Sequence, residues 1–251
     1  GSSNGSFINQ QRVTTPRLLK DGDRIAMGRF EMEFKQTKKD EASVDTLSLQ
    51  DTLISDTPEI QQITILVADI RGFTTLSEQV DIRTLTKLMN TWFHQVSDTI
   101  IKHGGIVDKF IGDCVFARWE SSQEQDKSVL QALSAASAIN QITRKLNETY
   151  TEVTEPITIG VGINTGAASM GIGQDNTALG DAVNIAFRLE SASKFLGTDV
   201  VLSESSYQYL PESFIEGRRQ HVQVKGKRDP VRICTLDFSD VDQILADKVE
   251  N

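Results

Sequence analysis

The sequence predicts an α+β fold: a mixed, largely antiparallel sheet with flanking helices, plus a small N-terminal β fragment. From residue 62 onward, strand-like and helix-like segments follow one another in the order β, α, β-hairpin, α, β, α, β. Residues 1–34 instead contain short β-like runs separated by turns, in "GSFIN", "RLLKDGDRIAMG" and "FEMEF". Because helices bury their apolar sides against a sheet, the first pattern favours a sheet with helices on its faces.

Composition narrows the class of protein. The 251 residues include 38% hydrophobic and 24% charged residues, which is typical of a folded globular chain. The net charge of -9 argues against nucleic acid and anionic membrane as partners. Cys114 and Cys234 lie outside any CxxC or Cys/His cluster, so we expect no disulfide framework, no zinc site and a reducing, cytoplasmic location. We also expect no membrane segment and no signal peptide in this chain.

Composition also suggests the boundaries of the parts. Residues 35–61 are polar and charged, with only a weak apolar register, and are predicted to be a linker that is partly helical. Residues 62–240 form the expected main domain, and residues 241–251 a C-terminal tail.

The first elements of the main domain are a strand, a helix and a hairpin. "QITILVADI", residues 62–70, is a continuous apolar run that predicts a buried strand. Residues 81–105 have apolar side chains at helical spacing and end at Gly104, which predicts a helix. "GGIVDKFIGDCVFARW", residues 104–119, predicts a hairpin around a Gly-Asp turn.

The later elements alternate helix and strand. Residues 126–150 are rich in Ala and Leu and predict a helix, and Pro156 precedes the strand "ITIGVGINTGAAS". "DAVNIAFRLESASKF" predicts a second helix that Gly197 ends. "DVVLSES" and "HVQVKGKRDPVRICTL" predict the last strands.

Two acids are candidates for metal binding. Asp69 ends the buried strand, before the expected loop "IRGFTTLS", and Asp113 lies in the hairpin turn. If the strand pairs with the hairpin, both carboxylates converge on a hard cation such as magnesium. Judged by spacing alone, the alternative that each is an ordinary turn or strand-end residue stays open.

Two further sets of residues could hold a substrate. Asn184 and Arg188 are separated by one helical turn, so they share a face and could grip one ligand, although a surface role for both is the plainer alternative. Lys225 and Lys227 in "VKGKRDP" could reach phosphates, or form a solvated basic turn.

Several familiar motifs are missing. The chain contains no GxxxxGK[ST] loop, and "GVGINTG" lacks the GxGxxG spacing. His94, His103 and His221 are far apart and show no metal-ligand spacing. Ser169 is not in a GxSxG turn, so no hydrolase nucleophile is indicated.

Five blocks occur in order: "VADIRGFTTLSE", "GGIVDKFIGDCVFA", "GVGINTG", "LGDAVNIAFRLES" and "VKGK". Together they resemble the class III nucleotidyl cyclase catalytic domain from residue 62 to residue 236. The resemblance implies a ferredoxin-like nucleotide cyclase fold and a head-to-tail homodimer with active sites at the interface. It also implies two Mg²⁺ or Mn²⁺ ions per site, held by Asp69, Ile70 and Asp113 of one subunit.

The same resemblance assigns roles in substrate binding. Lys109 and Thr177 become the base-reading pair of a bacterial-type subclass, a donor and an acceptor that suit adenine. Asn184 would orient the ribose, Arg188 would neutralise charge on the α-phosphate, and Lys225 would bind the β- and γ-phosphates. Phe73 and Thr74 are also assigned to the substrate site.

The implied activity is that of an adenylate cyclase, a phosphorus–oxygen lyase that converts ATP to 3′,5′-cyclic AMP and pyrophosphate. A guanylate cyclase is one alternative, but that group usually carries Glu in place of Lys109 and Cys in place of Thr177. A catalytically inactive module that senses phosphopeptides or nucleotides is another.

The N-terminal residues resemble the latter half of a forkhead-associated (FHA) domain, a family that binds phosphothreonine peptides. Ser3 and Asn4 match part of its recognition loop, but the strands that carry the family's phosphate-binding Arg and Ser are absent. We therefore expect a phosphothreonine partner only for a parent chain with the complete domain.

Overall fold

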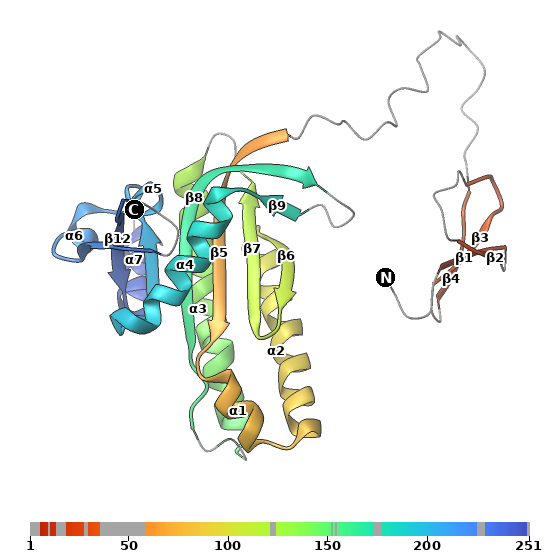
Figure 1. Ribbon diagram of the computed structural model, residues 1–251, viewed down its shortest axis with the longest axis horizontal. Helices are drawn as coiled ribbons and strands as arrows, with labels where there is room; N and C mark the ends of the chain where they lie inside the picture. Colours follow the sequence, from red (N-terminus) through yellow and green to blue (C-terminus); the bar gives the residue numbers. More distant parts are fainter. Residues whose placement is uncertain are drawn as a thin grey trace, which may run out of the picture. The chain divides into compact units, whose positions relative to one another are not determined.

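The structure is a computed structural model (Figure 1). It describes residues 6–9, 11–13, 19–27, 30–35, 59–120, 124–151, 153, 155–172, 177–224 and 229–249. The chain forms two compact units, Gly1–Ile54 and Ser55–Asn251, which are described separately below. The division falls inside residues 35–61, where the sequence predicts a linker.

The N-terminal unit contains a small antiparallel sheet, which confirms the predicted β fragment. Its strands are β1 (Ser6–Ile8), β2 (Gln11–Arg12), β3 (Arg24–Met27) and β4 (Phe30–Glu33), in the order β2-β1-β3-β4. The buried Asp23 carboxylate organises the turn before β3. It accepts from the Asn9 amide at 2.8 Å and from the Lys20 backbone N–H at 2.8 Å. These bonds satisfy a charge that burial would otherwise penalise.

The larger unit is built on a mixed, largely antiparallel sheet, as the sequence predicts. The order of its strands is β11-β12-β10-β8-β5-β7-β6. Its strands are β5 (Glu59–Ile70), β6 (Ile106–Ile111), β7 (Cys114–Glu120), β8 (Ile159–Ile172), β9 (Thr177–Leu179), β10 (Val200–Ser203), β11 (Arg219–Val222) and β12 (Val231–Leu236). β9 pairs with β8 beside this path, and the β8–β10 pair is parallel.

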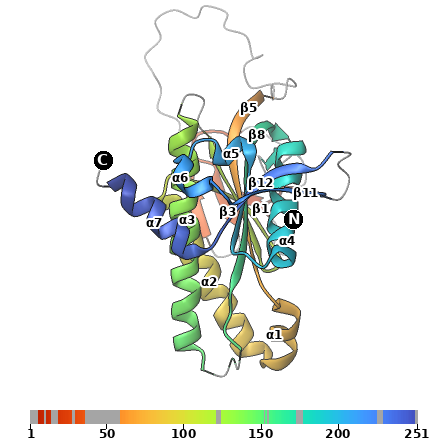
Figure 2. The ribbon, with the colours of Figure 1, turned by 90° about the vertical axis from the view of Figure 1, so that its left-hand side faces the viewer.

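Helices cover both faces of this sheet. They are α1 (Phe73–Gln79), α2 (Ile82–Lys102), α3 (Gln125–Thr149), α4 (Asp181–Leu196), α5 (Glu204–Tyr207), α6 (Glu212–Ile215) and α7 (Phe238–Val249). Figure 2 shows α2, α3 and α7 on one side of the sheet and α4 on the other. Among the described helices, none combines the length and the apolar character needed to cross a membrane.

Strand β5 is buried on both faces, as its uninterrupted apolar run predicts. Leu66, Ala68 and Ile70 belong to the hydrophobic cluster that includes α2 and α3 residues. Ile63 and Val67 belong to a second cluster, which α4 covers. The side-chain alternation of a strand thus sends neighbouring β5 residues into two different cores.

Helix α2 follows the predicted spacing closely. Asp81 caps it, because its carboxylate accepts from the backbone N–H groups of Arg83 at 3.0 Å and Thr84 at 3.2 Å. The helix ends before Gly104, which has a φ of 75°. Six of its apolar residues are buried, whereas Ile101 is 62% exposed, although its spacing also suggested the core.

The structure differs from the sequence predictions at several places, and it also contains α6, which the sequence does not predict. "IRGFTTLS" contains the start of α1 rather than only a loop, and α5 begins within "DVVLSES". Both helices are too short to show a clear helical period. The predicted tail is helical to Val249, because Val241 and Ile244 of α7 are fully buried. Finally, β5 begins at Glu59, within the predicted linker.

Gly162 on β8 allows α4 to pack directly on the sheet. A Cβ at this position would lie 2.3 Å from the Ala186 carbonyl oxygen and 2.3 Å from the Glu190 backbone nitrogen. Backbone atoms cannot move aside as a flexible side chain can. The glycine cluster in "GVGINTG" therefore serves close helix packing, in agreement with the interpretation of a strand passing a close neighbour.

We predict that Gly162→Ala destabilises the protein by more than about 2 kcal/mol, because α4 must shift away from β8. Gly197→Ala is the matched control, since a Cβ there meets nothing within 4 Å and only the positive φ of 65° is strained. That variant should cost about 1 kcal/mol. Urea unfolding of both variants measures the difference, and equal losses would contradict direct backbone packing at Gly162.

Candidate active site

Asp69 and Asp113 lie together at one end of the central strands. Asp69 is next to the last residue of β5, and Asp113 is in the turn between β6 and β7. Strands β5 and β7 pair antiparallel with Asp69 opposite Cys114, so the turn residue Asp113 is its close neighbour. The first strand therefore pairs with the hairpin, and this pairing is the condition for the two acids to converge.

The two carboxyls interact directly. Burial, the charge of Asp113 and a hydrogen bond between the side chains raise the pKa of Asp69 from 3.8 to about 6. Burial also raises the pKa of Asp113, but the shared hydrogen bond lowers it. The pKa of both carboxyls is therefore raised, and the pair takes up a proton more readily than an isolated aspartate. Two carboxylates this close favour a cation or a proton between them.

A third acid, Glu190 on α4, adds to this negative field. Burial and then the charge of Asp69 raise its pKa from 4.5 to about 7, while Arg71 opposes the shift. The Arg71 Nη2 donates to Ser193 Oγ at 3.3 Å and to the Thr198 carbonyl. Arg71 therefore links the end of β5 to α4 and supplies a positive charge near Glu190.

Cys114 is not part of the reactive set. Burial, followed by the charges of Asp69, Glu190 and Asp113, strongly raises the pKa of its thiol. The thiol therefore stays protonated at neutral pH and is a poor metal ligand, because metals bind the thiolate. The donor set at this site consists of oxygen atoms.

An oxygen-only set that carries excess negative charge fits a hard divalent cation such as Mg²⁺ or Mn²⁺. Asp69 and Asp113 would hold it, and Ile70 offers a backbone carbonyl beside them. In the described part of the chain, no group of three or more His, Cys, Asp or Glu side chains could hold a metal. The pair would thus rely on backbone, substrate or water oxygens for its remaining ligands.

The other residues predicted for the site occupy several elements. Phe73 and Thr74 open α1, directly after the β5 end, with Phe73 half-buried against the core and Thr74 exposed. Asn184 and Arg188 lie on α4, one turn apart as predicted, and their side chains have no hydrogen-bond partner among the described residues. Lys225 and Lys227, like Ser3 and Asn4, lie outside the described residues.

Lys109 and Thr177 come from two different strands. Lys109 is a half-buried residue of β6, and Thr177, which is 8% exposed, begins β9. The Thr177 hydroxyl donates to the carboxylate of Asp108, the residue before Lys109. Asp108 therefore ties the start of β9 to β6 at the residue next to Lys109.

Sequence reasoning missed Glu190, Arg71 and Asp108. Each lies next to or within a block that was singled out for other residues. An available signal was charge within apolar surroundings, since Asp108 follows "GGIV" and Arg118 interrupts "CVFARW". A charge that a strand buries must have a partner.

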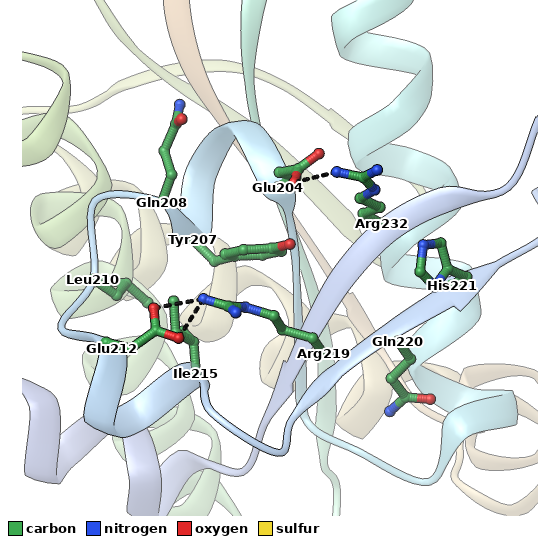
Figure 3. Close-up of a pocket in the computed structure, with 10 residues that line it drawn as sticks. All are labelled: Glu204, Tyr207, Gln208, Leu210, Glu212, Ile215, Arg219, Gln220, His221 and Arg232. Atoms are coloured by element: carbon green, nitrogen blue, oxygen red, sulfur yellow. Dashed lines mark hydrogen bonds and ion pairs between the residues drawn. The ribbon is translucent and has the colours of Figure 1, made fainter.

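A separate cavity of about 620 Å³ lies at the far edge of the sheet, between α5, α6, β11 and β12 (Figure 3). None of the predicted site residues that the structure describes lines it. Its arginines are paired: Arg219 with Glu212 at 2.5 Å, and Arg232 with Glu204 at 3.0 Å. Arg219 also lies 5.8 Å from the centre of the Tyr207 ring. With both guanidinium groups paired, the cavity is distinct from the acidic site in position and in charge.

A family model described as the adenylate and guanylate cyclase catalytic domain matches residues 56–236, which is most of the chain. The chain belongs to this family. A model of the FHA domain matches residues 1–28, in agreement with the resemblance of the N-terminal residues. The cyclase domain thus contains Asp69, Asp113 and Glu190.

Curated relatives of this cyclase domain include two adenylate cyclases. That of Anabaena cylindrica is 33% identical over 186 residues, which are 69% of this chain and 36% of that protein. The terminal-differentiation specific adenylate cyclase of Dictyostelium discoideum is 33% identical over 185 residues, 69% of this chain and 8% of that protein. The chain therefore spans about a third or less of the length of these relatives.

Solved cyclase structures have the same fold. The adenylyl cyclase CyaB from P. aeruginosa is 32% identical, with a TM-score of 0.62, and the match covers 72% of this chain and 96% of that one. A guanylyl cyclase structure is 29% identical, with a TM-score of 0.62 and coverage of 71% and 92%. The predicted nucleotide cyclase fold is thereby confirmed.

The crowded carboxyls predict how stability changes with pH. Because the pKa of Asp69 is raised to about 6, the folded state binds more protons than the unfolded state between about pH 4 and 6. Stability should therefore fall as pH rises through this window. Asp69→Asn removes the repulsion, so at pH 8 in EDTA the variant should be more stable than the wild type by roughly 1 kcal/mol, after discounting for solvent screening.

Denaturant unfolding at pH 4.5 and pH 8 in EDTA measures this effect. Asp98→Asn, at an exposed carboxyl on α2, is the control and should leave the pH dependence unchanged. Two results together would show that the two carboxyls do not repel each other. The wild type would be more stable at pH 8 than at pH 4.5, and Asp69→Asn would be no more stable than the wild type at pH 8.

Proposed function

We propose that this chain is the catalytic part of an adenylate cyclase, which converts ATP to 3′,5′-cyclic AMP and pyrophosphate. The observation that carries the proposal is the paired Asp69 and Asp113 at the end of β5, within a cyclase domain. The Lys109 predicted from the resemblance to read the base supports ATP as the substrate. The adenylate cyclases among its relatives support the same substrate.

Two divalent cations per site are the proposed cofactors, with Asp69, Ile70 and Asp113 as their protein ligands. When bound, such ions lower the pKa of the attacking hydroxyl and stabilise charge on the triphosphate. The chain's own contribution is to hold two carboxylates at a distance where their charges repel, so that the site gains free energy when positive charge enters.

The remaining residues would position the ATP. Asn184 is proposed to orient the ribose, and Arg188 to stabilise charge that grows on the α-phosphate. Lys225 is proposed to bind the β- and γ-phosphates. Phe73 and Thr74 lie beside the acids, at the start of α1, where they would contact the triphosphate. The reaction is then an in-line attack by the ribose 3′-hydroxyl, with pyrophosphate as the leaving group.

Lys109 and Thr177 would read the base. Adenine presents an acceptor at N1 and a donor at its 6-amino group, which a lysine donor and a hydroxyl acceptor complement. Guanine has the opposite pattern at these two positions. Lys109 therefore favours ATP over GTP.

We further propose that two chains pair head to tail and share their sites. Asp69 and Asp113 of one chain would act with Asn184, Arg188, Lys109 and Thr177 of its partner. The side chains of Asn184 and Arg188 have no hydrogen-bond partner among the residues that the structure describes, which is in keeping with this arrangement. Two buried, free cysteines suit a reducing compartment such as the cytoplasm. A phosphothreonine protein is the partner proposed for the complete FHA domain of a parent chain.

The first test is turnover of ATP and GTP by the purified chain with Mn²⁺, followed as cyclic nucleotide and pyrophosphate. ATP should be the better substrate, and Lys109→Glu should reduce the preference for ATP by about tenfold or more, since a donor becomes an acceptor. Thr177→Cys in addition should reduce it further.

Lys102→Glu, an exposed change of the same charge at the end of α2, should leave the ratio unchanged. Preference for GTP in the wild type would make the chain a guanylate cyclase. Release of no pyrophosphate from either nucleotide would instead support a catalytically inactive sensing module.

The second test addresses the shared site. Asp69→Ala and Asn184→Ala chains should each be inactive alone, because each damages every site of its own homodimer. When mixed in equal amounts, half the dimers are mixed and each contains one intact site, so activity should return to about a quarter of the wild-type value. Inactivity after mixed dimers have been demonstrated would rule out the shared-site arrangement.

A further inference from the structure

The Asp108 carboxylate is buried among three hydrogen-bond donors. Its side chain is fully buried, and it forms an ion pair with Arg118, which is itself 3% exposed. Its Oδ2 accepts from the Arg118 guanidinium and, at 3.0 Å, from the Ala178 backbone N–H. Its Oδ1 accepts from the Thr177 hydroxyl. Arg118 is held in turn by Glu120 at 2.8 Å.

A β-bulge places Asp108 in this position. On β7, Ala117 pairs with Val107 and the next residue, Phe116, pairs with Lys109, so Asp108 is an extra residue of β6 without a partner. A bulge breaks the strict alternation of side chains along a strand and redirects one of them. Asp108 is thereby available to β9, while Lys109 stays in register with β7.

The bond to Asp108 fixes the direction of the Thr177 hydroxyl. A hydroxyl has one proton to donate, and a carboxylate paired with arginine has none. The proton of Thr177 is therefore committed to Asp108, and only the lone pairs of its oxygen remain for a ligand. Thr177 can accept a hydrogen bond from a nucleotide but cannot donate one.

We propose that Asp108 is a positioning residue that sets base specificity by committing the Thr177 proton, so that this site selects an amino group and rejects a carbonyl at position 6 of the purine. The proposal rests on the proposed function, in which Thr177 contacts the base. A free hydroxyl can donate or accept a hydrogen bond, and Asp108 is the residue that restricts the Thr177 hydroxyl to accepting one.

The asymmetry of the Asp108 contacts gives a sharp test. Two donors face Oδ2 and one faces Oδ1, so in Asp108→Asn the amide oxygen takes the Oδ2 position and the NH₂ group points at Thr177. The Thr177 oxygen then accepts from Asn, and its own proton turns towards the ligand. One isosteric substitution thus reverses the polarity of the hydroxyl.

The experiment compares ATP with inosine triphosphate, which has a carbonyl in place of the 6-amino group, in the full chain with Mn²⁺. The wild type should prefer ATP, and Asp108→Asn should lower the ratio of the two kcat/KM values by about tenfold or more, with inosine triphosphate gaining relative to ATP. Lys109 is present in both proteins, so its own contribution cancels from this change. Parallel changes for the two nucleotides would overturn the proposal, because a purely structural role predicts them.

Two further variants complete the test. Asp242→Asn makes the same chemical change at a carboxylate that accepts from the Ser137 hydroxyl at 2.5 Å, between α3 and α7, and should leave the ratio unchanged. Thr177→Val removes the hydroxyl but keeps the Asp108–Arg118 pair, so the preference for ATP should fall even if Asp108→Asn does not fold. An unchanged ratio in Thr177→Val would overturn the proposal.

The binding affinities of the wild type and of Asp108→Asn for ATP and for inosine triphosphate are also measured. If the wild type forms no cyclic AMP, the proposed function has failed, but discrimination in binding that Asp108→Asn reverses still supports the role of Asp108. Equal affinity of the wild type for both nucleotides would overturn it.

Discussion

The position of β5 governs the rest of the larger unit. It has a neighbouring strand on each edge and helices over each face, and residues 63–68 are buried. Asp69 can carry a carboxyl because it stands where this buried run ends. The hairpin brings Asp113 to the same place, since β7 lies beside β5 in antiparallel register. The acidic pair is therefore a consequence of sheet order, and the sheet holds the two carboxyls together against their repulsion.

Polarity in the site is set by neighbours as much as by residue type. Asp69, Asp113 and Glu190 differ in pKa because burial and mutual charge act on each differently. Thr177 is a second example, since its hydroxyl donates directly to Asp108, which is paired with Arg118. The pKa values and hydrogen-bonding roles of these residues depend on neighbours supplied by β6, β7 and α4. The packing of these elements therefore matters to the site as well as the residues that line it.

The sequence predicts the long elements well, because β5 and α2 each have one clear pattern over many residues. It does not predict α5 and α6, whose four residues cannot show a period, or α7, whose apolar residues follow a strand end directly. Asp69 and Asp113 are predictable as a pair from strand order. Asp108 is not, because its role depends on a bulge, and no local residue pattern specifies where a strand gains an extra residue.

The bulge has a consequence for how this family can change over time. Replacing a side chain at Lys109 or Thr177 alters one hydrogen bond and leaves the sheet as it was. Deleting Asp108 would remove the bulge but leave Val107 opposite Ala117 and Lys109 opposite Phe116, so the register of β6 against β7 would not change. The deletion would instead remove the carboxylate that accepts from Thr177, so the extra residue of β6 serves its contact with β9 and not its pairing with β7.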